Sequence, residues 1–250
     1  MRRHRLFAVV AVCLLALGGC TATTNSTAPP GLSETGVTDV SALVEAHTEA
    51  LQSTSFTVRS NRTMRSVDPA FTVSTIQTWN INTSSPIRGS VVSSTTASGE
   101  VPDRYLQAPD RTVTWRNGRT TVERVETNGT VSQRRLDFLN TSIRPNQALH
   151  RRMIAELTTR SNATVERVSR DGTEWYRVSA SLTDTGVTTN ASMTLLVTPA
   201  GIVREIRSTR TVRYRSGPRR ITHRVRIGDI GTTNTDPPRW AVEAFTETEQ

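Results

Sequence analysis

From residue 55 to residue 227 the chain consists mostly of short stretches in which apolar and polar residues alternate with a period of two. This alternation places one face of a stretch inward and the other toward water, which is typical of half-buried β-strands. Asn117-Gly118 and Asn128-Gly129 each separate two such stretches, and Asn-Gly is a strong signal for a tight hairpin. The pattern therefore predicts a mostly antiparallel sheet.

The clearest predicted hairpin covers residues 55–82. Phe56 and Val58 share one face of its first strand, Trp79 lies on the apolar face of its second, and Asp68-Pro69 occupies the turn between them. The same pattern predicts strands at 87–98, 103–107, 111–117, 119–126, 130–136, 163–169, 173–183, 190–198, 202–215 and 219–227.

Two stretches have the spacing of an amphipathic helix instead. The first is a predicted helix over 39–53, capped by Thr38 or Asp39, with an apolar stripe of Val40, Leu43, Val44, His47 and Leu51. The second begins at Pro145, and its apolar side consists of Leu149, Met153, Ile154 and Leu157. About ten strands and one or two helices, with no internal repeat, predict a single α+β domain over residues 38–250.

The N-terminus has the pattern of a lipoprotein signal. Arg2, Arg3 and Arg5 precede an apolar run from Leu6 to Leu17 that is too short to cross a bilayer, and the run ends at Gly18-Gly19-Cys20. The pattern predicts a signal peptide over 1–19, lipidation of Cys20, and a flexible tether over 20–37. It also predicts a location on the outer face of the cell membrane. In the alternative, Cys20 is an ordinary small residue at the end of an uncleaved anchor.

Composition excludes several kinds of chemistry. All 31 basic residues are arginines, so the chain has no lysine for a phosphate-binding loop, a Schiff base or a Ser-Lys dyad. Cys13 lies within the predicted signal, which leaves Cys20 as the one mature cysteine and rules out a disulfide or a cysteine metal site within the mature chain. Loss of residues 1–19 lowers the charge from +9 to 28 − 22 = +6.

No catalytic or metal-binding pattern is present. The mature histidines, His47, His150 and His223, are far apart in the sequence and belong to different predicted elements, with no His-x-x-x-His spacing. There is no nucleophile elbow and no glycine-rich dinucleotide loop. We therefore expect neither an enzyme nor a cofactor or metal. A lone histidine on an apolar stripe is usually a core residue, so His47 is expected to pack.

Two surface features are candidates for modification or binding. Asn-x-Ser/Thr sites predict N-glycosylation, although a threonine-rich chain also produces such sites by chance; they are Asn25, Asn61, Asn82, Asn128, Asn140, Asn162 and Asn190. The last predicted hairpin carries a basic surface for anionic lipid head groups or surface glycans, formed by Arg213, Arg215, Arg220, Arg224 and Arg226. Alternatively, these arginines are a solvated face paired with nearby carboxylates. Nucleic acid is not an expected partner.

Four segments resemble the lipid-anchored carriers of the LolA and LppX/LprG type, and more closely lipoproteins of halophilic archaea that share their plan. The segments are Leu43–Leu51 with Ser55–Val58, Gly172–Val178, Leu195–Val203, and Pro238–Trp240. The resemblance implies a half-barrel, a curved sheet wrapped on one or two helices, with an apolar cavity for an acyl chain. The expected cavity residues are Leu43, Val44, His47, Leu51, Phe56 and Trp79.

Two functions remain open at this point. One is a membrane-anchored protein that binds or carries a lipid or another hydrophobic ligand in that cavity. The other is a structural or interaction lipoprotein of the cell envelope with a filled core. A hollow beside these cavity residues would favour the first function, and close packing would favour the second.

Overall fold

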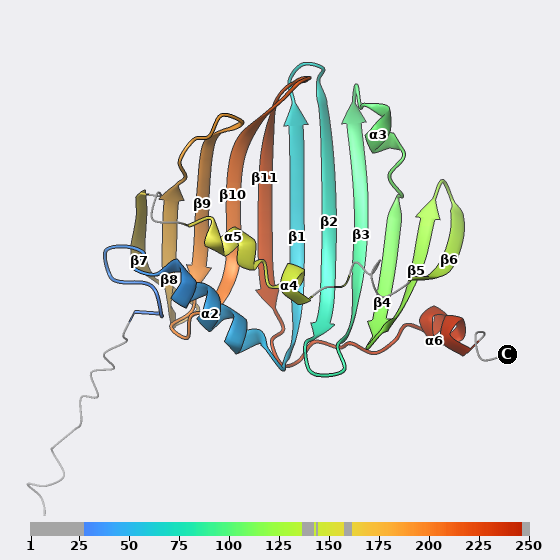
Figure 1. Ribbon diagram of the computed structural model, residues 1–250, viewed down its shortest axis with the longest axis horizontal. Coiled ribbons are helices and arrows are strands. Elements are labelled where there is room, and N and C mark those ends of the chain that lie inside the picture. The colour runs from blue at the N-terminus through green and yellow to red at the C-terminus, as the bar shows by residue number, and fades with distance from the viewer. Residues whose placement is uncertain (1–27, 137–142, 144, 158–161, 247–250) are drawn as a thin grey trace, which may run out of the picture.

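The computed structural model describes residues 28–136, 143, 145–157 and 162–246. In this part of the chain eleven antiparallel strands form one sheet (Figure 1). They are β1 Ser55–Ser66, β2 Phe71–Asn82, β3 Arg88–Gly99, β4 Arg111–Asn117, β5 Thr120–Thr127, β6 Thr130–Leu136, β7 Asn162–Arg170, β8 Thr173–Ser181, β9 Thr188–Val197, β10 Val203–Tyr214 and β11 Gly217–Gly228. The predicted α+β class and curved antiparallel half-barrel are confirmed.

The sheet joins two meanders through one long-range pairing. Its order is β6-β5-β4-β3-β2-β1-β11-β10-β9-β8-β7, so every neighbouring pair is consecutive in sequence except β1 and β11. These two central strands pair from Thr57 with Gly228 to Ser66 with Arg219. The first and last strands along the chain are therefore neighbours at the centre of the sheet, and their pairing joins its two halves.

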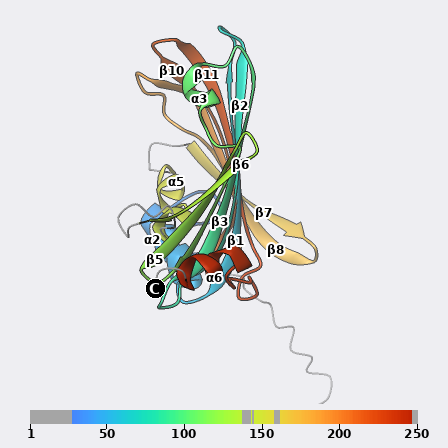
Figure 2. The same ribbon diagram turned by 90° about the vertical axis from the view of Figure 1, so that its right-hand side faces the viewer.

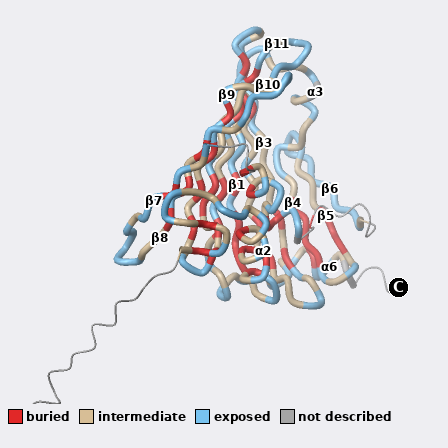
Figure 3. The backbone as a smooth tube through the Cα atoms, turned by 60° about the vertical axis from the view of Figure 1, so that its left-hand side comes forward, coloured by how far each residue is buried: buried red, intermediate tan, exposed pale blue. Residues whose placement is uncertain are grey.

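The two faces of the sheet have different roles. The helical face carries Val58 and Trp79, which are cross-strand partners, and the outer face carries Arg59 opposite Arg226. Figure 2 shows the twisted sheet from its edge, with α2 on one side and the end of the β7–β8 hairpin bending away on the other. Buried residues gather in the half of the sheet nearest α2 (Figure 3).

Helix α2, Val40–Leu51, confirms the first predicted helix. Asp39 caps it, because its Oδ1 atom accepts hydrogen bonds from the backbone N–H groups of Ser41 at 2.8 Å and Ala42 at 3.1 Å. Its apolar face packs against the core, and Leu43 and Leu51 on that face are inaccessible to solvent.

The second predicted helix is broken into two short pieces, so the prediction of one continuous helix is wrong. They are α4, Pro145–Ala148, and α5, Arg151–Ala155. His150 stands between them with a φ of 48°, in the left-handed region that a continuing helix cannot contain. The break still allows Leu149, Ile154 and Leu157 to be buried in the core.

Two local elements differ from what the sequence predicted. Residues 103–107 were expected to form a strand, but α3, Asp103–Leu106, is a single helical turn. A C-terminal helix, α6 Arg239–Thr246, was missed. Its Ala241 packs with Trp115 and Val122 of the outer face. The spacing of Trp240, Ala241 and Ala244 was the available signal for it.

The described part of the predicted tether, residues 28–37, is folded. Leu32 is buried in the main core and forms an isolated bridge with Val37. Gly31 has a φ of 78° and its backbone approaches that of Asp39 too closely for a side chain. The start of the domain therefore moves toward the N-terminus. A flexible tether over 20–27 remains a prediction, because these residues lie outside the described ranges.

A second core at the far end of the sheet surrounds a buried arginine. Arg219 is 1% exposed, and its guanidinium lies over the rings of Tyr214 at 4.5 Å and Phe71 at 5.1 Å. It donates hydrogen bonds to the Tyr105 hydroxyl at 2.8 Å and to Ser216 Oγ at 2.7 Å. One side chain thus links α3 to the tip of the β10–β11 hairpin.

We expect Arg219→Ala to lower the free energy of unfolding by about 2–4 kcal/mol, because it removes the cation–π contacts and the two hydrogen bonds of a side chain that is 1% exposed, and leaves a cavity in its place. Arg219→Lys should recover part of this loss, since it restores the charge without the planar group. Urea denaturation measures the effect. The adjacent, exposed Arg220→Ala is the control and should stay within about 0.5 kcal/mol of the unmodified protein; equal losses at the two positions would contradict this role.

Candidate functional site

The expected cavity residues come together on the helical face, but they pack against one another. Leu43, His47, Leu51 and Phe56 have no accessible surface, and Trp79 is 7% exposed. Val44 is half-buried and packs at the edge of the same core. They therefore share one core, and their role as a ligand cavity stays a prediction.

Four open surface pockets are lined by described residues, and Leu43, Leu51, Phe56 and Trp79 line none of them. Val44 lines one, an open space of about 560 Å³ between α2 and α5 that also meets Thr48, Gln52 and Arg151. A ligand in contact with Leu43, Leu51, Phe56 or Trp79 would require these packed side chains to move apart.

His47 is a core residue that ties three elements together. Its Nε2–H donates to the carbonyl of Leu149 at 2.9 Å, and its Nδ1 accepts from the backbone N–H of Val203 at 3.2 Å. These partners require the neutral Nε2–H tautomer. Burial lowers the pKa of His47 from 6.5 to about 4, so the ring is neutral at pH 7.

The three histidines, far apart in the sequence, converge in the structure. The rings of His150 and His223 meet edge to face with centroids 5.9 Å apart, and His47 is close enough to lower the pKa of His150 electrostatically. Ser60 Oγ and His223 Nε2 form a hydrogen bond of 2.7 Å. The sequence could not show this convergence, because the residues lie on α2, on the α4–α5 joint and on β11.

The environment keeps this cluster neutral. Burial lowers the pKa of His150 to about 4, and the charges of His223 and His47 act in the same direction. Burial, together with Arg62 and Arg210, lowers the pKa of His223 to about 4. An imidazole with so low a pKa is a weak base for activating Ser60 at neutral pH, so this pair resembles a structural hydrogen bond more than a catalytic dyad.

In the main core beneath the helices, two buried nitrogen atoms lack hydrogen-bond partners among the described residues. They are Trp79 Nε1 and His150 Nε2. A buried polar group without a partner is costly and needs an explanation, such as a ligand or a water molecule. Trp79 belongs to the main core, and so does Leu149, the neighbour of His150 in the sequence.

The predicted basic surface is divided in the structure. The carboxylate of Glu205, on the outer face, accepts hydrogen bonds from the Nε–H groups of Arg207 at 2.6 Å and Arg224 at 2.8 Å. Nε of Arg226 lies 3.8 Å from the other carboxylate oxygen. Burial alone would raise the pKa of Glu205, but the hydrogen bonds and charges of Arg207 and Arg224 outweigh it and lower the pKa. Two of the predicted arginines, Arg224 and Arg226, therefore share a carboxylate, as the alternative interpretation expects.

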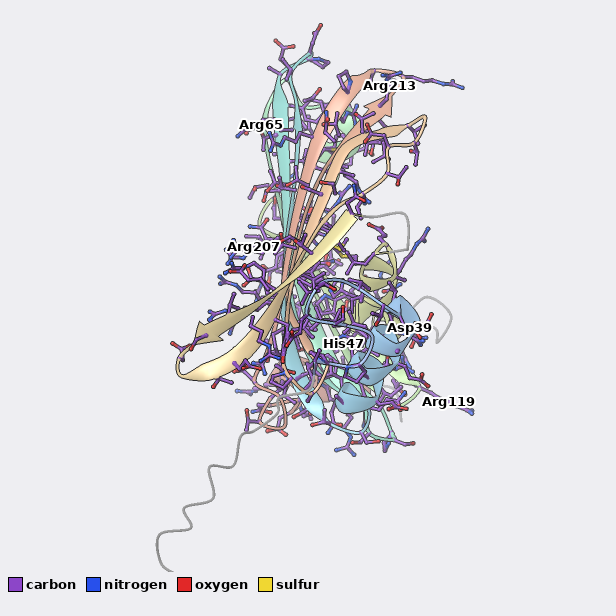
Figure 4. All side chains as sticks on the ribbon, turned by 90° about the vertical axis from the view of Figure 1, so that its left-hand side faces the viewer. Asp39, His47, Arg65, Arg119, Arg207 and Arg213 are labelled. Carbon is purple, nitrogen blue, oxygen red and sulfur yellow. The ribbon has the colours of Figure 1, made fainter. Side chains whose placement is uncertain are left out.

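The remaining predicted arginines are exposed. Arg220 lies on the outer face, in register with Arg65. Arg213 and Arg215 belong to the tip of the β10–β11 hairpin, and Figure 4 shows Arg213 near the top of the sheet, away from Arg207. Eight residues of strand separate Arg213 from Glu205, which corresponds to about 26 Å.

The predicted glycosylation sites fall partly within the structure. Asn61, Asn128, Asn162 and Asn190 are exposed, whereas Asn82 is half-buried and its side chain accepts a hydrogen bond from the backbone N–H of Ser84. Asn25, Asn140, the signal peptide over 1–19 and Cys20 lie outside the described residues. Their modification and cleavage remain predictions.

Two other kinds of feature were sought over the described ranges. No group of three or more histidine, cysteine or acidic residues is placed to hold a metal ion. No helix there combines the length and the hydropathy that a membrane crossing needs.

The sequence matches no protein-family model and no curated protein sequence. Among solved structures, LprF from Mycobacterium bovis is similar over 82% of this chain and 98% of its own, with 12% identity and a TM-score of 0.44. A LolA-superfamily protein from Nitrosomonas europaea is similar over 84% of this chain and 99% of its own, with 14% identity and a TM-score of 0.28. An outer-membrane lipoprotein-sorting protein domain from Vibrio parahaemolyticus is similar over 81% of this chain and 96% of its own, with 7% identity and a TM-score of 0.29. At these values the likenesses identify no ligand or partner for this chain.

Proposed function

We propose that this protein is an exported lipoprotein that binds a hydrophobic, acyl-chain ligand on the helical face of its sheet. In this proposal Cys20 carries the lipid anchor, and residues 20–27 connect it to the domain on the outer face of the cell membrane, as in the lipoproteins of halophilic archaea that the sequence resembles. No catalytic role is part of the proposal.

The observation that carries this proposal is the pair of unpartnered buried nitrogens, Trp79 Nε1 and His150 Nε2. The core around them includes apolar side chains such as Phe56, Val58 and Ile227, and the polar groups beside His150, which are His47, His223 and Ser60, already have hydrogen bonds. An amphiphile suits such a site. Its polar end can form a hydrogen bond with one of the buried nitrogen atoms, while its chain contacts the apolar strands.

The segment over this layer is suited to displacement. Helices α4 and α5 have four and five residues, and His150 interrupts them. Helices of this length have little stability of their own and depend on tertiary packing. One hydrogen bond, from His47 to the carbonyl of Leu149, connects the segment to α2 at this break. Displacement of 145–157 would expose the apolar strands beneath it.

One observation favours the second candidate, a structural or interaction lipoprotein with a filled core. Leu43, Leu51 and Phe56 are completely buried by protein atoms, without a ligand. In that case the cell envelope is the site of action, and the exposed asparagines and the outer face make the contacts.

The two candidates differ in how the tryptophans respond to an acyl chain. We expect a long-chain fatty acid that carries bromine on its chain to quench the fluorescence of Trp79 saturably. Trp79→Phe should lose most of this quenching. Trp175→Phe is the matched control, because Trp175 lies on the opposite face of the sheet, and it should keep the quenching. Absence of saturable quenching, or equal loss in both variants, would support the filled-core candidate.

The anchor has its own test. Cys20→Ser is expected to release the protein into the medium or to leave an unprocessed precursor, because the thiol that accepts the lipid is gone. Cell fractionation with mass measurement distinguishes these outcomes. A mature-sized species that stays in the membrane would contradict the anchor.

A further inference from the structure

A pocket of about 350 Å³ opens on the outer face, where the end of the β7–β8 hairpin bends away from the sheet (Figure 2). Four different strands supply its arginines, which are Arg59 of β1, Arg170 of β7, Arg204 of β10 and Arg226 of β11. Of these four, only Arg226 belongs to the basic surface predicted from the sequence. The pocket therefore depends on strand pairing, which brings distant arginines to one place.

Positive charge exceeds negative charge at this pocket. Its carboxylates are Asp171, Glu205 and Asp229. Glu205 is already occupied by Arg207 and Arg224 from beside the pocket. With Arg207 and Arg224 included, six arginines and three carboxylates lie in or beside the pocket. Asp171 is almost fully exposed and lies 3.9 Å from Arg170 Nε.

Two of the arginines differ in how they are held. Arg204 is fixed in place, because its Nε donates to the carbonyl of Ile227 at 2.7 Å. Burial lowers the pKa of Arg204; Asp229 opposes this effect and the nearby charge of Arg170 adds to it. Arg59 is exposed and has no hydrogen bond or ion pair within the described residues. The pocket thus combines one oriented guanidinium with one that is free to reach a ligand.

Trp175 forms part of the wall of the same pocket, and its buried Nε1 has no acceptor among the described residues. An adjoining pocket of about 340 Å³ shares Arg170 and Glu205 and adds Arg177 and Arg207. A ligand that fills the first pocket therefore has room to extend along the outer face, among further guanidinium groups.

We infer that this pocket binds a phosphate group through Arg59, Arg170, Arg204 and Arg226. Guanidinium groups bind phosphate oxygens in pairs of parallel hydrogen bonds and remain charged at any physiological pH. A dianionic phosphate would offset the surplus of positive charge. The pocket lies on the face opposite the proposed acyl ligand. Phosphate binding there does not depend on whether the core accepts a lipid. The phosphate belongs either to a soluble ester or to a phospholipid head group.

The test uses the full chain carrying Cys20→Ser, so that no attached lipid contributes to binding. Calorimetry measures inorganic phosphate and glycerol phosphate at physiological salt, and flotation measures vesicles of phosphatidylglycerol against vesicles of phosphatidylcholine. We expect saturable phosphate binding that weakens at least tenfold in Arg59→Gln/Arg226→Gln. The matched control, Arg65→Gln/Arg213→Gln, removes the same charge outside the pocket and should bind as before.

The measurements also separate the two sources of phosphate. Binding of the soluble esters without the vesicles assigns a soluble ligand, and pocket-dependent flotation with phosphatidylglycerol assigns a head group. Two results would overturn the inference: no binding of either kind, or equal weakening in the pocket and control variants, which would show attraction to the net charge alone.

Discussion

Replacement of His47 by leucine is expected to lower the free energy of unfolding by about 2–4 kcal/mol. Leucine fills a similar volume, but it leaves the carbonyl of Leu149 and the backbone N–H of Val203 buried without partners. Each such loss costs about 1–3 kcal/mol. Chemical denaturation measures the change.

The same variant tests how the segment over the core is held. Because the lost hydrogen bond connects α2 to the α4–α5 joint, amide hydrogen exchange over 145–157 should accelerate in His47→Leu beyond the exchange in the central strands. Glu49→Ala, an exposed change on the same helix, is the control. A His47→Leu protein as stable as this control would contradict the bridging role.

Acidification from pH 7 to pH 4 is expected to remove more stability than any single substitution. The pKa values of His47, His150 and His223 are each lowered from 6.5 to about 4 in the folded protein. Between these values the unfolded chain binds protons that the folded protein does not, so stability falls as the pH falls. His47 and His150 each contribute about 3 kcal/mol over this window, and the less buried His223 contributes less.

His150→Asn tests the origin of this pH dependence. Asparagine tolerates the left-handed backbone at this position and does not titrate. We expect the variant to lose about 3 kcal/mol less than the unmodified protein between pH 6.5 and pH 4, as measured by urea denaturation at each pH. An unchanged pH dependence would show that the acid sensitivity arises elsewhere.

Local sequence patterns were sufficient for most of the strands. The hairpins over 55–82 and around Asn117-Gly118 were predicted, because alternation and turn residues act over a few positions. The pairing of β1 with β11 was not predictable in this way, since it depends on contacts between residues more than 150 positions apart. The pocket at Arg59 and Arg226 and the contact between Ser60 and His223 both follow from that pairing.

The candidate site was predicted in part for a related reason. Helical and strand periods identify the residues that face inward, and the structure places four of them, Leu43, Leu51, Phe56 and Trp79, in one core. Whether these side chains fill the space between helix and sheet depends on volumes and on the path of the α4–α5 segment. The left-handed His150 that breaks this segment has no clear sequence signal, because neither glycine nor asparagine stands there.

Native mass spectrometry with organic extraction tests the proposed ligand binding most directly. The protein, purified from membranes of its own type of host and freed of detergent, should carry one non-covalent lipid in addition to its anchor, and extraction should recover that lipid in stoichiometric amount. A mass that corresponds to the anchored chain alone, with no lipid in the extract, would contradict the account and assign the protein a filled core.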